Sequence, residues 1–209
     1  MKRVALVFMI LIATMAYGND WSKVADILTK SVVYVNSNDG SCSGFVINAH
    51  VNAGISDKGN REKNYILTAA HCNGKELYAD HVPATIVYLD PQKDLMVLEV
   101  SDLNRSALKL AMANPKIGDS VASYGYGFGL ERALFRTATI SDDKLYIPED
   151  NIGGPFIVTD AAFVGGQSGG PVVDLAGDVV LIVQRGGQGV GIGVGAEILR
   201  TQVGRYFEK

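Results

Sequence analysis

The chain has 209 residues, of which 47% are hydrophobic and 20% charged, and its formal net charge is −3. A chain of this length and composition can bury a sizeable core and fits one domain or one compact pair of barrels. Acidic residues outnumber basic ones and no basic stripe appears, which argues against nucleic acid as a partner.

The first 18 residues have the pattern of a secretory signal peptide. Lys2 and Arg3 precede the apolar run 4–13, and Ala16 and Gly18 occupy the small-residue positions of a cleavage site. An uncleaved membrane anchor is the alternative, but the run is shorter than the roughly 20 residues that a spanning helix needs. We therefore expect an exported protein, periplasmic or secreted, with no stable membrane insertion after cleavage.

Beyond the signal, the sequence predicts one short helix and then many short strands. Residues 21–30 place apolar side chains on one side of a helix, and 197–207 predict a final amphipathic helix. Polar, glycine-containing stretches at 52–64 and 141–154 predict exposed loops. The predicted strands are 31–35, 43–47, 65–67, 76–78, 84–88, 118–124, 136–140, 157–159, 179–183 and 190–194.

Short strands with frequent turns indicate an all-β barrel or sandwich, and residues 113–116 are the best candidate for a link between two barrels. The segment Tyr124–Gly129 superficially resembles a phosphate-binding loop. Such a loop requires a following helix, whereas residues 136–140 favour a strand. No cofactor is therefore expected.

Three residues spaced widely along the chain are candidates for catalysis. His71 lies in Thr68-Ala69-Ala70-His71-Cys72 after an apolar stretch, whereas His50 and His81 lie in polar surroundings and are interpreted as surface residues. Asp94 opens the apolar run 95–98, where a carboxylate is costly unless it accepts hydrogen bonds, for example from an imidazole. Asp90 is the nearest competitor, but it precedes a proline in a turn-like segment.

The nucleophile candidate is Ser168, within the segment Gly165–Pro171. Glycines on both sides let the backbone turn tightly and present its N–H groups, and a serine attacks only when a base takes its proton. The same segment fits the G-x-S-x-G elbow of α/β-hydrolases, but that fold places its histidine after the serine. No histidine follows Ser168, and the order His71, Asp94, Ser168 is that of chymotrypsin-type proteases.

The chain has two cysteines, Cys42 and Cys72. Two cysteines do not complete a structural zinc site without other ligands, so no metal is expected. In a reducing cytosol they would be unrelated thiols, whereas in an exported protein an even pair predicts a disulfide. Such a bridge would hold the segment that carries His71, and the chain-entropy model gives it roughly 3 to 4 kcal/mol of stabilisation.

Together the segments 68–72, 94–98 and 166–171 resemble the trypsin-like serine endopeptidases. Within that group, Thr159-Asp160-Ala161-Ala162-Phe163 leading into 166–171 is similar to the HtrA (DegP) branch. The resemblance implies two six-stranded antiparallel barrels at about 31–113 and 117–196, within a protease domain of residues 19–209 that has short terminal helices. It also implies a bridge between the two cysteines. Nothing remains in the sequence for the PDZ domain that many HtrA proteins carry.

The resemblance assigns roles to the candidate residues. Ser168 attacks a peptide carbonyl, His71 moves the proton, and Asp94 holds the imidazole, while the N–H groups of Gly166 and Ser168 form the oxyanion hole. Gln167 stands where trypsin has an acid that pairs with a freed N-terminus, so no activation of that kind is expected. The implied substrate is a polypeptide.

The family pattern also places the substrate-binding residues. Ala162, six residues before the serine, replaces the cation-binding acid of trypsin, and Phe163, Gly191 and Gly193 add apolar or open wall. An uncharged side chain is therefore expected before the cleaved bond. The substrate backbone is expected to pair as an added strand near Val183 and Gln184.

Two other functions compete with this interpretation. A non-catalytic, peptide-binding or chaperone-like homologue would be expected to have lost a member of the triad, yet all three residues are present. An acyl-hydrolase acting on small esters is the second alternative, and turnover of a peptide against its ester analogue separates the two.

Overall fold

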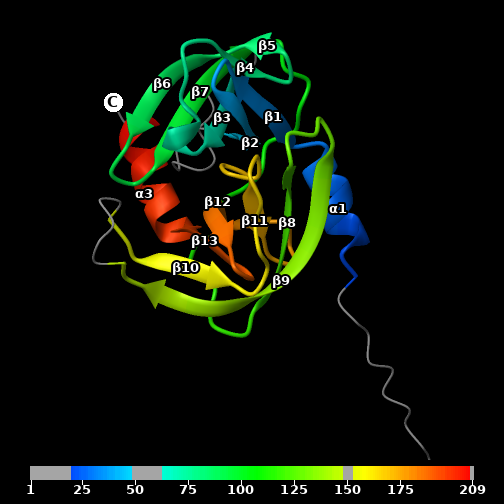
Figure 1. Ribbon diagram of the computed structural model, residues 1–209, viewed down its shortest axis with the longest axis vertical. Coiled ribbons are helices and arrows are strands. Elements are labelled where there is room, and N and C mark those ends of the chain that lie inside the picture. Colours follow the sequence, from blue (N-terminus) through cyan, green and yellow to red (C-terminus); the bar gives the residue numbers. More distant parts are fainter. Residues whose placement is uncertain (1–19, 49–62, 148–152, 208–209) are drawn as a thin grey trace, which may run out of the picture.

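The computed structural model describes residues 20–48, 63–147 and 153–207. The predicted signal peptide and residues 52–62 of the predicted loop lie outside these ranges. The described chain forms two β units that are stacked in Figure 1, with helix α1 (Ser22–Thr29) on one flank and helix α3 (Ala196–Phe207) on the other. Both terminal helices are thus confirmed.

The first unit is a seven-stranded antiparallel sheet in the order β5-β4-β1-β2-β3-β7-β6. The prediction of a closed, six-stranded first barrel is therefore wrong in both strand number and closure. The strands are β1 (Val32–Ser37), β2 (Gly40–Ile47), β3 (Lys63–Thr68), β4 (Leu77–Ala79), β5 (Val82–Pro83), β6 (Thr85–Asp90) and β7 (Leu95–Ser101).

The two edge strands of this open sheet are consecutive parts of one chain segment that changes partner. Strand β5 pairs with β4 over two residues and ends at Pro83, and after Ala84 the chain pairs with β7 as β6. Pro83 has no N–H to donate, but the Ala84 N–H still donates to the carbonyl oxygen of Leu77 at 2.8 Å, so the change of partner comes between Ala84 and Thr85. The sheet curls without closing.

The second unit is a closed antiparallel barrel in the order β10-β13-β12-β11-β8-β9, and its six strands agree with the prediction. They are β8 (Ser120–Tyr126), β9 (Ala133–Leu145), β10 (Phe156–Thr159), β11 (Pro171–Val173), β12 (Val179–Gly187) and β13 (Val190–Gly195). Strand β9 continues through residues 141–145, which the sequence predicted as loop. These residues pair with β10, where Phe156 opposes Leu145.

Both helices are held by apolar side chains of their inner faces. Val24 and Leu28 of α1 are buried, as are Leu199 and Val203 of α3. All four belong to a core cluster that spans both β units, so the helices close the ends of a continuous core. Among the described residues, no helix has the length and apolar character needed to cross a bilayer.

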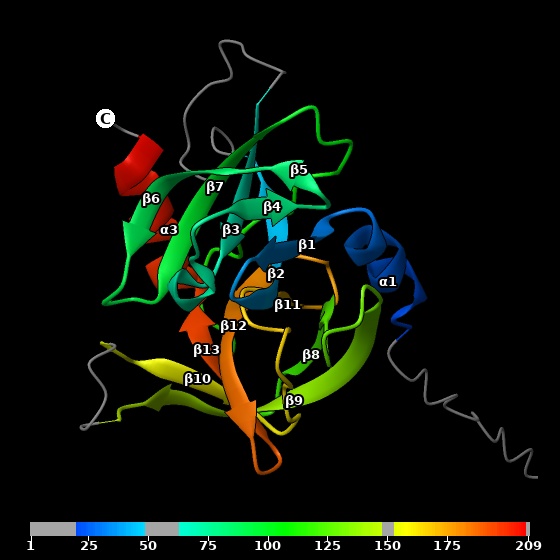
Figure 2. The ribbon, with the colours of Figure 1, turned by 45° about the horizontal axis from the view of Figure 1, so that its top comes forward.

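The ladder between β3 and β7 brings two catalytic candidates together. Thr68 at the end of β3 opposes Met96 near the start of β7. His71 follows Thr68 by three residues on the short 3-10 helix η1 (Ala70–Cys72), and Asp94 directly precedes β7. Because the strands are antiparallel, both residues leave the sheet at the same edge, which faces the second unit (Figure 2).

Candidate active site

The carboxylate of Asp94 holds His71 through two hydrogen bonds. The backbone N–H of His71 donates to Oδ1 at 2.8 Å, and the imidazole Nδ1 lies 2.8 Å from Oδ2. Asp94 is buried, whereas 47% of the His71 side chain is exposed. The carboxylate fixes the imidazole ring so that Nε2 is left for the cleft.

Asp94 has a backbone conformation that asparagine and aspartate tolerate better than other residues with side chains. Its φ is +50°, in the left-handed region. The side chain of Gln184 on β12 secures this turn, because its Nε2 donates to the carbonyl oxygen of Lys93 at 2.6 Å and lies 3.4 Å from that of Asp94. Gln184 thus links the second unit to the backbone that carries the acid.

Ser168 lies on the tight turn before β11, in the other β unit. The turn contains two glycines with positive φ, Gly166 at +96° and Gly169 at +78°. Gln167 is buried between them, and its Oε1 accepts the N–H of Val164 at 3.0 Å. This amide therefore stabilises the turn from within, at the position where trypsin has its activation acid.

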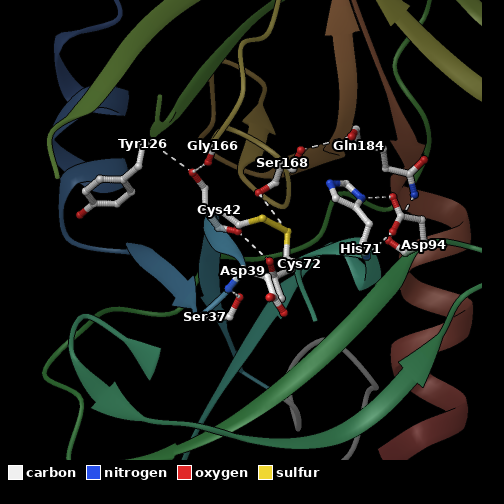
Figure 3. Close-up of a disulfide and its surroundings, with 12 residues drawn as sticks. Ser37, Asp39, Cys42, His71, Cys72, Asp94, Tyr126, Gly166, Ser168 and Gln184 are labelled. Atoms are coloured by element: carbon white, nitrogen blue, oxygen red, sulfur yellow. Dashed lines mark hydrogen bonds and ion pairs between the residues drawn. A yellow bond between two sulfur atoms is a disulfide. The ribbon is translucent and has the colours of Figure 1, made fainter. Parts of the chain in front are cut away.

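The serine hydroxyl faces His71 across the cleft but bonds elsewhere in this conformation (Figure 3). Ser168 Oγ donates to the carbonyl oxygen of Gln184 at 3.3 Å. Catalytic hydrogen bonds are often long or misaligned without substrate and tighten in the complex.

The peptide between Gly165 and Gly166, a predicted part of the oxyanion hole, is held by a hydrogen bond on its carbonyl side. The carbonyl oxygen of Gly165 accepts the N–H of Phe128 at 2.9 Å. In a trans peptide the N–H points opposite to the carbonyl, so the Gly166 N–H points away from Phe128. Among the described residues, neither this N–H nor that of Ser168 donates to a protein acceptor. Two free donors thus flank the nucleophile.

Ser43 on β2 fastens the serine turn to the first unit. This fully buried residue donates its backbone N–H to Ser168 O at 2.8 Å and its hydroxyl to Gly166 O at 2.9 Å. The same hydroxyl accepts the N–H of Tyr126 at 2.8 Å. Sequence analysis did not identify Ser43, because a single serine in a strand carries no signal of its partners across the fold.

Replacing Ser43 tests this anchoring role. Ser43→Ala leaves the Gly166 carbonyl and the Tyr126 N–H without their partner, and an unsatisfied buried group costs about 1 to 3 kcal/mol. We expect lower thermal stability and a fall in kcat of about 10- to 100-fold with little change in KM, because the oxyanion donors lose their fixed orientation. Unfolding curves and steady-state kinetics on a peptide substrate measure both effects.

Ser123→Ala is the matched control for this substitution. Ser123 is also a buried serine on a strand, but its Oγ has no hydrogen-bond partner among the described residues. Removing an unsatisfied hydroxyl leaves stability unchanged or slightly higher. Equal losses of kcat in Ser43→Ala and Ser123→Ala would contradict the anchoring role.

The disulfide predicted between Cys42 and Cys72 is present, with a Cα–Cα distance of 6.1 Å. It joins β2 to the 3-10 helix of His71, so it holds the base against the strand that also carries Ser43. Cys42, Cys72 and His71 offer ligand atoms within 4.8 Å of one another. Zinc binds thiolates, however, and two sulfurs joined in a disulfide supply none.

The phenolic hydroxyl of Tyr126, whose backbone N–H bonds to Ser43, remains neutral at physiological pH. Burial raises the pKa of Tyr126 above its ordinary value, and the charge of Asp80 acts in the same direction. Tyr126 also packs edge-on against Tyr34 of β1, with ring centroids 5.1 Å apart. This aromatic pair adds apolar contact between the two units next to the serine turn.

The residues predicted to form the specificity pocket are only partly brought together. Phe163 is buried, and its ring lies so close to Gly191 that a Cβ there would overlap it. Gly186 is equally close to the Phe163 backbone. Gly193 instead packs against Ile182 inside the barrel. Phe163 thus fills space between two glycines rather than lining an open wall, and Gly193 faces the core.

Two further predicted positions differ in what they offer a substrate. Ala162 is half-buried, and its carbonyl oxygen accepts Arg136 Nη1 at 2.8 Å. Val183 is buried, its N–H donates to Gly170 O, and its carbonyl accepts the N–H of Gly169. Val183 therefore has no backbone group left for an added strand, because its N–H and its carbonyl oxygen both bond within the protein. The carbonyl oxygen of Gln184 accepts the Ser168 hydroxyl at 3.3 Å, so this group faces the nucleophile.

Residues 42–180 match the family described as trypsin-like peptidase domain, and this range includes His71, Asp94 and Ser168. The chain belongs to that family. The resemblance inferred from the three motifs is thereby confirmed.

Relatives of this trypsin-like peptidase domain include two bacterial proteins named as probable periplasmic serine endoproteases, DegP-like. The protein from Halomonas elongata is 35% identical over 132 residues, which cover 57% of this chain and 26% of the relative. The protein from Chlamydia pneumoniae is 35% identical over 119 residues, which cover 53% of this chain and 24% of the relative. The matched region thus spans about a quarter of each of these relatives.

Solved structures share the fold over most of the domain. A protease from M. tuberculosis in an active form is 25% identical with a TM-score of 0.67, covering 86% of this chain and 82% of that one. The inactive form of the same protease gives 0.69. A serine endoprotease from Yersinia pestis gives 0.71 at 20% identity, covering 92% and 68% of the two chains. That last likeness concerns the fold alone.

Proposed function

We propose that this protein is an exported serine endopeptidase that cleaves polypeptides through an acyl-enzyme intermediate. The observation that carries the proposal is the pairing of His71 with a buried Asp94 at 2.8 Å, facing a serine whose turn presents two free N–H groups. A structural histidine has no need of this combination. The family supplies the reaction type, and the geometry supplies the candidates for each role.

The proposed mechanism gives each residue one task. His71 takes the proton of the Ser168 hydroxyl as Oγ attacks the scissile carbonyl, and Asp94 stabilises the imidazolium that forms. The oxyanion accepts hydrogen bonds from the N–H groups of Gly166 and Ser168. His71 then protonates the leaving amine, and a water molecule repeats the sequence on the acyl-enzyme.

The hydrogen bond from the Ser168 hydroxyl to the Gln184 carbonyl describes the enzyme without substrate, and we propose that a bound substrate breaks this bond. A substrate strand that donates its N–H to the Gln184 carbonyl replaces the serine hydroxyl there. The freed hydroxyl then turns toward the imidazole. Binding of the substrate and activation of the nucleophile are thereby coupled through one carbonyl oxygen.

The substrate residue before the cleaved bond is proposed to carry an uncharged side chain. Ala162 offers no carboxylate at the position where trypsin binds a cation. Export to the periplasm or beyond is proposed from the N-terminal signal pattern and from relatives whose names call them periplasmic.

The second candidate function is that of a non-catalytic protein that only binds peptides. The observation that favours it is the hydrogen bond from the Ser168 hydroxyl to the Gln184 carbonyl. In this conformation the hydroxyl bonds to Gln184 and no bond to His71 is present among the described residues. A protein locked in this state would hold a peptide without cleaving it. A covalent probe separates the two functions.

Labelling with a fluorophosphonate tests the proposal, since the probe reacts only with an activated serine. We expect stoichiometric labelling of the wild type and none of Ser168→Ala, with cleavage of casein lost in parallel. Ser106→Ala serves as a matched control, because Ser106 is an exposed serine outside the cleft and its backbone N–H alone bonds to Lys30. Equal casein cleavage by wild type and Ser168→Ala would refute the assignment.

A further inference from the structure

A cavity of about 280 Å³ begins at the candidate nucleophile and ends at a carboxylate. Its lining includes Ser168, Gly166 and His71, the Cys42–Cys72 disulfide, and Asp39. In Figure 3 Asp39 and Ser37 lie on the far side of the disulfide from Ser168. The remaining lining residues are Ser37, Gly40, Ser41, Asn73 and Gly165.

This cavity lies on the side of the serine where the leaving half of a substrate must pass. Gln184, whose carbonyl is proposed to bind the substrate before the scissile bond, contacts Ser168 from β12. The disulfide approaches the same serine from β2 and the 3-10 helix, and the Cys72 sulfur lies 4.0 Å from the Ser168 carbonyl oxygen. Residues after the scissile bond therefore run over the disulfide toward Asp39.

The charge in this cavity is unbalanced. Its described lining contains neither lysine nor arginine, and Asp39 is its one carboxylate. Asp39 is exposed, and its carboxylate makes no ion pair within the described chain. Its backbone N–H donates to Ser37 Oγ at 3.2 Å, so the turn before β2 holds the residue in place.

We propose that Asp39 selects substrates with a lysine or arginine within the first two residues after the cleaved bond. This inference rests on the proposed protease function and adds a substrate class to it. The methylene stem of such a side chain lies along the disulfide, and its cationic end meets the carboxylate and the oxygens of Ser37, Ser41 and Asn73. An acidic side chain in the same place meets a like charge.

Quenched fluorogenic peptides measure this preference directly. One series keeps the residues before the cleaved bond constant and places Arg, Ala or Glu at the first and second positions after it. We expect kcat/KM to be about three- to tenfold higher for Arg than for Ala in at least one of the two positions, and lower still for Glu. The preference falls as salt rises, because the pair is exposed to solvent.

Substitutions at Asp39 then test whether its carboxylate causes the preference for Arg. Asp39→Asn keeps the shape and removes the charge, so the Arg and Ala peptides become equal, and Asp39→Lys reverses the order in favour of Glu. Asp26→Asn makes the same change in net charge on the exposed face of α1 and leaves the preference intact. An Arg preference that survives in Asp39→Asn, or a wild type with no preference, overturns the proposal.

The design keeps failure of this inference distinct from failure of the proposed function. Fluorophosphonate labelling and cleavage of the all-Ala peptide report whether the protein is a serine endopeptidase at all. If both are present and the Arg, Ala and Glu peptides are cleaved alike, Asp39 has no role in selection and the protease assignment stands. If both are absent, the two proposals fall together.

Discussion

Asp94→Asn is expected to lower kcat by about 10³- to 10⁴-fold while leaving the protein folded. The wild-type carboxylate accepts two N–H groups of His71, from the backbone and from Nδ1. An amide has one oxygen to accept with, so its NH₂ group faces one of these donors. If the oxygen keeps the backbone N–H, the NH₂ group meets Nδ1 and selects the tautomer that carries its proton on Nε2, which cannot accept the proton of Ser168.

Asp90→Asn provides the comparison for Asp94→Asn. Asp90 lies in the same turn, and its Oδ1 accepts the N–H of Lys93 at 3.0 Å, a bond that an asparagine oxygen also makes. We expect kcat within a few-fold of wild type. Asparagine tolerates positive φ, so the +50° at position 94 does not unfold the first variant. Circular dichroism confirms folding, and a larger loss in Asp90→Asn than in Asp94→Asn would reject the assignment of the acid.

Gly169→Ala is expected to cause the largest loss of stability of any single methyl group added at the serine turn. The added Cβ would overlap Thr68 Oγ1 and the carbonyl oxygen of Ser43, and would lie 2.8 Å from the Ala69 nitrogen. Thr68 and Ser43 are themselves joined by a buried hydrogen bond of 2.7 Å. Overpacking and a φ of +78° together cost about 3 to 5 kcal/mol, which lowers the melting temperature by roughly 10 °C.

Gly165→Ala is the control for Gly169→Ala. Gly165 lies three residues before the serine, and a Cβ there meets no atom within 4 Å. Its backbone is outside the positive-φ region, so alanine fits without strain. Thermal unfolding should show little change in this variant. A melting temperature of Gly169→Ala equal to that of Gly165→Ala would show that the serine turn is not packed against β2 as described.

The sequence by itself determined the chemistry and its order along the chain. A histidine after one apolar strand, a carboxylate before another and a serine between glycines are local patterns, and the absence of a later histidine excluded the α/β-hydrolase order. Most strands were predictable for the same reason, since alternation and turn residues act over a few positions. Pairing of the two cysteines followed from their number.

Only the tertiary structure decided what depends on contacts between distant segments. Closure of the first sheet depends on whether its edge strands β5 and β6 pair with each other, and no local pattern reports that. The bond between the Ser168 hydroxyl and the Gln184 carbonyl, the packing of the Phe163 ring and the anchoring bonds of Ser43 each join residues far apart in sequence. Asp39 shows the same limit, because an exposed turn aspartate becomes part of a cleft only when β2 is packed beside the serine turn.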